Sequence, residues 1–161
     1  MRVLSQSLLD ELAGKASTSA RGRTHFNIHA SAADLVQRYI VVADRRSYFR
    51  PHRHLTRSEL ALVLRGGFEV LTFSDDGLLG ARYSVGPGLG DLGFELPRAT
   101  WHTLLATADG SAFLEVKEGP YDPSTAVEFA PWAPEEGAAE VPQFMQRLLE
   151  ATAGMPCRKH P

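Results

Sequence analysis

The sequence predicts an all-β domain, a barrel or a sandwich, with one short helix before it and one after it. Eight short β-rich runs lie between residues 36 and 119, at 37–44, 47–54, 59–66, 68–77, 81–86, 92–97, 101–107 and 112–119. Turn residues such as Asp75-Asp76-Gly77 and Gly86-Pro87-Gly88 separate them. Short strands at this spacing are typical of β-sandwiches and barrels, and the lack of interrupting helical patterns argues against a parallel α/β sheet.

The flanking segments have helical periodicity. An apolar stripe predicts a helix over about residues 4–15, rather than a secretory signal, and a second stripe predicts a helix over about 139–151. We therefore expect one domain over residues 1–161. Its parts are an N-terminal helix with a polar arm (4–35), a barrel (36–119), an irregular segment with a helix (120–152) and a frayed tail (153–161).

Composition excludes several classes of function. The chain has 161 residues and a formal net charge of −2, which gives no electrostatic reason to expect nucleic acid or an anionic membrane as a partner. No apolar run approaches the roughly 18 residues of a membrane span. The single cysteine, Cys157, excludes an internal disulfide and fits a reducing cytoplasm.

Three histidines and one glutamate form a candidate metal site. His52 and His54 project from the same side of a strand, because side chains alternate faces. Glu59 opens the next predicted strand, where a hairpin-like return would bring its carboxylate back, and His102 begins a later strand. A lone histidine on a strand is more often a surface or core residue. The full set suits one divalent transition metal per chain (Fe, Mn, Ni, Zn, Co or Cu), with about two coordination positions left open.

The spacing of these residues resembles the cupin superfamily. The first cupin motif is His-x-His, three or four residues, Glu, six residues and Gly, which His52, His54, Glu59 and Gly66 match. The second motif, Pro-x-Gly-x-x-His, is matched from Pro97 to His102 except that an alanine replaces the glycine. The resemblance implies a double-stranded β-helix (jelly-roll) barrel with these four residues as metal ligands. Departures at other motif positions, which concern loop shape, are Arg46, Asp91, Ala99 and Ala106.

A narrower resemblance covers about residues 4–137. The strings YFRPHRH, EVKEGPYDP and WAPEEG are similar to the WbuC-like cupin metalloproteins, as is RGRTHFNIHA. That family is associated with bacterial surface-polysaccharide gene clusters. The likeness therefore implies a small-molecule ligand, such as a sugar or nucleotide sugar, and leaves the reaction open.

Other residues are candidates for binding the small molecule. Tyr48 and Arg50 share strand parity with His52, so they would face the same cavity, although Pro51 can mark a bulge. Arg50 could hold a carboxylate or phosphate, or be solvated at the rim. Glu115 and Lys117 alternate on one strand, where they form either an acid–base or substrate-binding pair inside the barrel or an ordinary charged surface.

The polar segment from Arg21 to Arg38 is rich in hydrogen-bond donors. Arg23, Asn27 and Arg38 could belong to a lid over the pocket mouth. Alternatively, the segment is a polar loop that fixes the N-terminal helix to the barrel.

The sequence is compatible with three functions. The first is a metalloenzyme catalysing isomerisation, dioxygenation or hydrolysis of a small molecule. The second is a non-catalytic module in which the metal is a structural pin or helps to sense a ligand. The third is an epimerase-like barrel that works without metal. We also expect a homodimer, because exposed sheet edges and apolar outer faces favour association.

Overall fold

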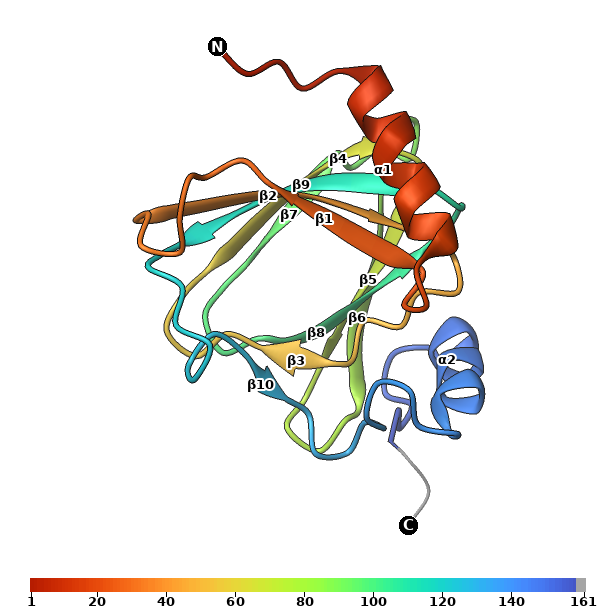
Figure 1. The fold of residues 1–161 in the computed structure, drawn as a ribbon. Coiled ribbons are helices and arrows are strands. Elements are labelled where there is room, and N and C mark those ends of the chain that lie inside the picture. The colour runs from red at the N-terminus through yellow and green to blue at the C-terminus, as the bar shows by residue number, and fades with distance from the viewer. Residues whose placement is uncertain (159–161) are drawn as a thin grey trace.

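The computed structural model describes residues 1–158 as two five-stranded antiparallel sheets with a helix against the outside of each (Figure 1). One sheet has the order β1 (Arg23–Asn27), β2 (Val36–Ala43), β9 (Ser111–Glu118), β4 (Glu59–Arg65) and β7 (Gly93–Leu96). The other has the order β10 (Glu128–Phe129), β3 (His52–Arg53), β8 (Trp101–Ala106), β5 (Phe68–Phe73) and β6 (Leu79–Val85). The helices are α1 (Gln6–Thr18) and α2 (Val141–Glu150).

Each of the eight predicted β-rich runs contains a strand, and two further strands were not predicted. β1 lies in the predicted polar arm and pairs along its whole length with β2, from Arg23 opposite Ala43 to Asn27 opposite Tyr39. We did not predict β1 because its sequence is mostly polar. An edge strand can be polar, since it needs only one apolar face. The run 47–54 contains paired strand only at His52–Arg53.

The interior of the barrel has a packed end and an open end. At the packed end, Val41 on β2, Val63 on β4 and Phe113 on β9 lie in one apolar cluster between the sheets. At the open end, the same strands carry polar residues: Tyr39 lies opposite Glu115, and Lys117 lies between Gln37 and Glu59. Three strands thus build the hydrophobic core with one half and a polar interior with the other.

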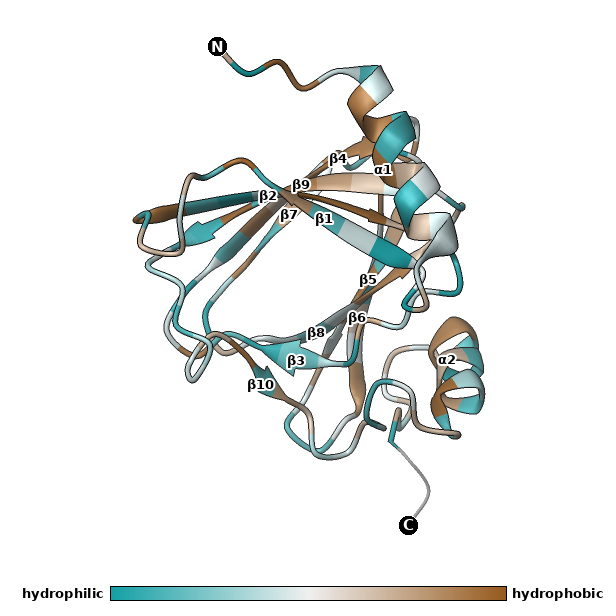
Figure 2. Ribbon diagram, viewed as in Figure 1, coloured by the Kyte–Doolittle hydropathy of each residue, from teal (hydrophilic) through white to brown (hydrophobic). Residues whose placement is uncertain are grey.

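Two further apolar clusters cover the outer faces of the sheets. α1 buries Leu9 and Leu12 against Ile40 on β2. The C-terminal segment and α2 bury Trp132 and Phe144 against the outer face of the β8–β5 sheet. Figure 2 shows hydrophobic and hydrophilic residues alternating around both helices, as expected for helices that pack by one face.

The C-terminal residues differ from the predicted frayed tail. Cys157 is buried, and its N–H donates to the Gly77 carbonyl at 2.8 Å, while the Leu79 N–H donates to the Met155 carbonyl at 2.9 Å. The chain up to residue 158 therefore docks on the turn between β5 and β6. The last predicted tail residues, 159–161, lie outside the described part.

Part of the outer surface of the first sheet remains apolar. Leu60, Leu62 and Leu64 alternate on β4 and are all exposed. The homodimer expected from such faces stays a prediction. No helix within residues 1–158 is both long and apolar enough to cross a membrane.

Candidate metal centre and its cavity

The four predicted ligands meet between the two sheets at the open end of the barrel. His52 on β3 lies directly opposite His102 on β8, whereas Glu59 begins β4 in the facing sheet. Potential ligand atoms, one from each of His52, His54, Glu59 and His102, all lie within 4.8 Å of one another. The predicted hairpin return is replaced by a crossing, because residues 55–58 carry the chain from one sheet to the other. Each sheet therefore contributes part of the cluster.

Backbone carbonyls fix the orientation of all three imidazoles. The Nδ1–H groups of His52 and His102 donate to the carbonyls of Arg50 and Thr100, each at 2.9 Å. The Nδ1–H of His54 donates to the Ala126 carbonyl at 2.5 Å. A carbonyl can only accept, so each neutral ring carries its proton on Nδ1 and its lone pair on Nε2. This arrangement prepares Nε2 to bind a metal.

Two features of the cluster call for a cation among these atoms. The Nε2 of His102 is buried and has no hydrogen-bond partner in the described part of the chain. The Nε2 of His54 lies 3.0 Å from a carboxylate oxygen of Glu59. Two acceptors at that distance need a cation beside them, and the Lys117 ammonium, 3.2 Å from His54 Nε2 and 3.3 Å from Glu59, supplies one. Three imidazole nitrogens and one carboxylate form a donor set that fits a divalent transition metal.

Charge states within the cluster also suit a metal. Burial and the neighbouring His102 hold the pKa of His52 well below its usual value, and burial likewise lowers the pKa of His102. Burial alone would raise the pKa of Glu59, but the neighbouring positive charges, the Lys117 ammonium first among them, outweigh it and hold that pKa well below its usual range. His52 and His102 therefore favour the neutral form and Glu59 the anion, which are the forms that bind metals.

Lys117 and Glu115 form a second charged group beside the cluster. Lys117 Nζ lies 3.3 Å from Glu59, 3.2 Å from His54 Nε2, and in direct contact with the Glu115 carboxylate. Burial alone would lower the pKa of Lys117, but Glu59 and Glu115 outweigh it and raise it. Burial and the charge of Glu59 raise the pKa of Glu115. Of the two predicted alternatives, the pair lies inside the barrel.

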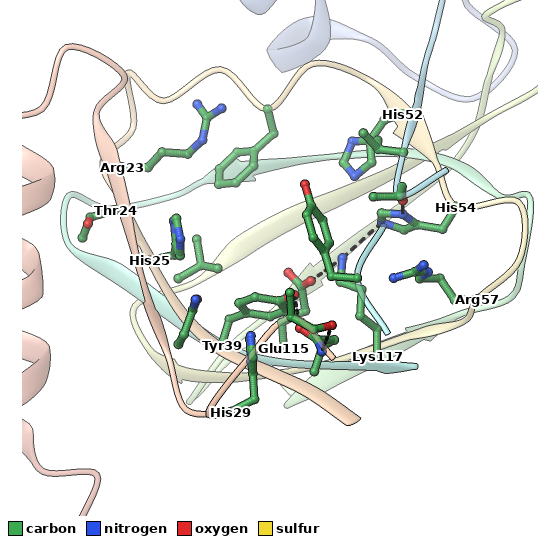
Figure 3. Close-up of a pocket in the computed structure, with 18 of the residues that line it drawn as sticks. Arg23, Thr24, His25, His29, Tyr39, His52, His54, Arg57, Glu115 and Lys117 are labelled. Carbon is green, nitrogen blue, oxygen red and sulfur yellow. Dashed lines mark hydrogen bonds and ion pairs between the residues drawn. The ribbon is translucent and has the colours of Figure 1, made fainter. Parts of the chain in front are cut away.

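A cavity of about 790 Å³ opens beside the cluster (Figure 3). His52 and His54 form part of its lining, together with Glu115 and Lys117. The opposite wall is made by β1, the start of β2 and the turn between them, and aromatic rings of Tyr39, Phe49, Tyr121 and Phe129 also line it. The size is that of a typical small-molecule site.

The predicted binding residues divide into two groups. Arg23, Asn27, Glu115 and Lys117 line the cavity, whereas Tyr48, Arg50 and Arg38 do not. The Tyr48 hydroxyl instead donates to the Pro134 carbonyl at 2.9 Å, within the cluster that holds α2. Strand alternation does not give the directions of Tyr48 and Arg50, because residues 47–51 are not regular strand.

Arg38 and Arg50 also have other contacts. Arg38 lies 3.7 Å from Asp34 on the surface. Arg50 lies over the Phe129 ring, with its closest carboxylate, Glu135, at 4.0 Å.

The predicted lid segment forms a wall. Arg23 donates to the Tyr48 carbonyl at 2.9 Å and to Glu136 at 3.0 Å, and Arg21 also pairs with Glu136. These contacts fix the start of β1 to the C-terminal segment. Closure over the pocket stays a prediction.

Several cavity residues were missed from the sequence. Tyr39 has the same parity as the buried Gln37, which is a usable signal, and its ring packs edge-on against His29 of the predicted lid segment, with ring centroids 4.8 Å apart. Arg57 lies in an irregular loop, where no periodicity indicates the direction of a side chain.

One known protein family matches about half of this chain. The model described as a domain of unknown function (DUF6016) matches residues 4–85, about half of the chain. The chain belongs to the DUF6016 family. No curated protein sequence matches this DUF6016 protein.

Solved structures with the same architecture are distant in sequence. A protein from Shewanella oneidensis has a TM-score of 0.57 and 16% identity, covering 74% of this chain and 82% of its own. The capsular polysaccharide assembling protein CapF from Staphylococcus aureus has a TM-score of 0.57 and 17% identity over 70% of this chain and 30% of its own. KdgF from Halomonas sp. has a TM-score of 0.50 and 20% identity over 63% of this chain and 82% of its own.

These structures have the cupin fold, so the predicted cupin jelly roll is confirmed for this DUF6016 protein. At such low identity the likeness concerns the fold alone. The fold and the cluster of three histidines and one glutamate together support a metal-binding cupin protein. The narrower likeness to WbuC-like proteins stays a prediction.

Proposed function

We propose that this protein is a divalent-metal-dependent enzyme that acts on a small polar molecule, namely a sugar or nucleotide sugar of surface-polysaccharide biosynthesis. The observation behind this proposal is that His52 and His54 line the large cavity. A metal used only as a structural pin would be expected in a site sealed by apolar side chains. Here the two ligands are next to charged groups and space for a ligand.

A bound divalent metal would supply Lewis-acid chemistry at this side of the cavity. The chain itself supplies a fixed positive charge and a group that can exchange a proton. Lys117 keeps its proton at Nζ because its pKa is raised, so it can donate a hydrogen bond, whereas the raised pKa of Glu115 favours exchange of a proton at its carboxylate closer to neutral pH. Both groups lie beside the metal ligands, so they would meet the part of a substrate that is nearest the metal.

Two further observations favour a sugar as the substrate. The rings of Tyr39, Phe49, Tyr121 and Phe129 give the cavity flat apolar surfaces between its polar groups. Carbohydrates have apolar faces edged by hydroxyls, and a mixed lining of this kind suits them. CapF, which shares the fold, is a capsular polysaccharide assembling protein, and this role agrees with the context implied by the WbuC-like resemblance.

Turnover of candidate substrates tests the proposal. Purified, metal-loaded protein is incubated with a panel of sugars and nucleotide sugars, and the products are followed by mass spectrometry. We expect a product that disappears in Glu115→Gln and in His102→Ala. Ligand-induced thermal stabilisation without turnover of any stabilising compound would contradict the enzyme and favour the non-catalytic binding module.

A further inference from the structure

Arg57 is a buried cation on the cavity wall that has no carboxylate partner within residues 1–158. Its exposed fraction is 7%, and it lies in the four-residue loop between the candidate ligands His54 and Glu59. Among the described residues its side chain makes one hydrogen bond, from Nη2 to the Pro120 carbonyl at 3.3 Å. Within residues 1–158, no carboxylate oxygen lies within 4.0 Å of its guanidinium.

The other lysine and arginine side chains that line the cavity each have a carboxylate within ion-pairing distance. Arg21 and Arg23 share the carboxylate of Glu136. Lys117 lies between Glu59 and Glu115. Among the described residues, Arg57 is therefore the one arginine or lysine of the cavity lining without such a carboxylate.

Carboxylates near Arg57 are engaged elsewhere. The two oxygens of Glu118 accept hydrogen bonds from Arg98 and from the Ser58 N–H, each at 2.8 Å. Asp122 accepts from the backbone N–H and the hydroxyl of Ser124. Both carboxylates feel the charge of Arg57, which helps to lower their pKa values, but neither lies within 4.0 Å of its guanidinium. The guanidinium donors that face the cavity therefore remain available to an anion that enters it.

A buried cation without a partner is costly, and an anion that enters the cavity removes that cost. A guanidinium presents parallel N–H donors that match the two oxygens of a carboxylate or a phosphoryl group. In Figure 3 the Arg57 guanidinium points toward the cavity, on the same side as Lys117 and His54. An anion held there would lie beside the metal ligands.

We propose that Arg57 is the anion-binding group of this cavity and that the substrate carries a carboxylate or phosphoryl group, held by Arg57 while the rest of the molecule faces His52 and His54. This inference rests on the proposed function, because it assumes that the cavity is the substrate site. It narrows the substrate to an acidic sugar or a sugar phosphate.

Calorimetric titration of the metal-loaded protein with glucose, glucuronate and glucose 6-phosphate tests the inference. These probes share a ring and differ in their anionic group. We expect at least one anionic probe to bind more than about 10-fold tighter than glucose, and the preferred one identifies the group as carboxylate or phosphoryl. Arg57→Gln should weaken binding of that probe by roughly 10- to 100-fold, the effect of losing a charge-assisted bidentate contact.

Two variants control for charge and folding. Arg57→Lys keeps the charge but loses the fork geometry, so it should recover part of the affinity. Arg45→Gln removes an exposed arginine that pairs with Asp109 outside the cavity lining, and it should bind like wild type. Metal content and melting temperature are measured for every variant.

The outcomes separate this inference from the function on which it rests. A wild-type protein that holds no metal contradicts the proposed function. With metal bound, the inference on Arg57 is overturned if glucose binds as tightly as its acidic relatives or if neither anionic probe binds. It is also overturned if Arg57→Gln behaves like Arg45→Gln.

Discussion

The packed and open ends of the barrel are built from the same strands but have opposite interiors. On β9, Phe113 faces an apolar core, whereas Glu115 and Lys117 further along the strand face the cavity. β4 changes in the same way, from Val63 to Glu59. Stability and function are therefore separated along each strand, and substitutions at one end should leave the other largely unchanged.

The largest expected loss of stability comes from the packed end. Phe113 is buried and meets Phe68 edge-on, with ring centroids 5.1 Å apart. Phe113→Ala should lower the free energy of unfolding by about 4 kcal/mol through lost burial and the cavity left behind. Urea denaturation measures this loss. Metal content per folded chain should be unchanged, and its loss would show that the two ends are not separable.

At the open end, we expect the largest loss of stability when the buried cation Lys117 is removed. In the metal-free protein, Lys117→Met leaves Glu115 and Glu59 in the interior without their cation. We expect about 3 kcal/mol of destabilisation. Lys117→Met combined with Glu115→Leu should cost less than the sum of the two single changes. Additive effects in urea denaturation would mean that the pair is not coupled.

Metal loading should stabilise the native chain. At a free metal concentration of about 100 times the dissociation constant, binding contributes about 2.7 kcal/mol, which corresponds to a rise of roughly 5–10 °C in melting temperature for a domain of this size. Scanning calorimetry before and after chelation measures it. His102→Ala should abolish the rise, and Asn27→Ala, on the opposite wall of the cavity, should keep it.

Acid should destabilise the metal-free protein through the same histidines. The pKa values of His52 and His102 are lowered in the folded state, whereas an unfolded histidine has a pKa of about 6.5. Below about pH 6.5 the unfolded chain therefore takes up protons that the folded chain does not, and stability falls. Between pH 7 and 5.5 we expect a loss of about 2 kcal/mol. A flat profile, or a His102→Ala variant with the same slope as wild type, would contradict this.

A small gain is expected in the loop that leads to His102. Ala99 has a φ of +62°, the left-handed conformation that disfavours a side chain, and its N–H donates to the His54 carbonyl at 2.8 Å. Ala99→Gly should stabilise the protein by about 0.5 kcal/mol. Thermal denaturation tests the sign, and the matched change Ala81→Gly within β6 should be destabilising instead.

Local sequence predicted the cluster of candidate ligands and most strands, because both have short-range signals. The motif spacing specified His52, His54, Glu59 and His102. Ala99, which replaces the glycine of the second motif, lies where the backbone has a positive φ. The chain crossing between β3 and β4 was not predicted, because sheet assignment depends on contacts distant in sequence. Arg57, Tyr48 and Arg50 lie outside regular strands, so side-chain alternation could not give their directions.

The central claim is that four side chains from two sheets hold one metal ion. Elemental mass spectrometry of the purified protein and of the His52→Ala/His102→Ala variant tests it most directly, with circular dichroism to confirm that both are folded. We predict about one divalent transition metal per wild-type chain and none in the variant. Metal retained by the folded variant, or none in wild type after incubation with each candidate ion, would contradict the claim.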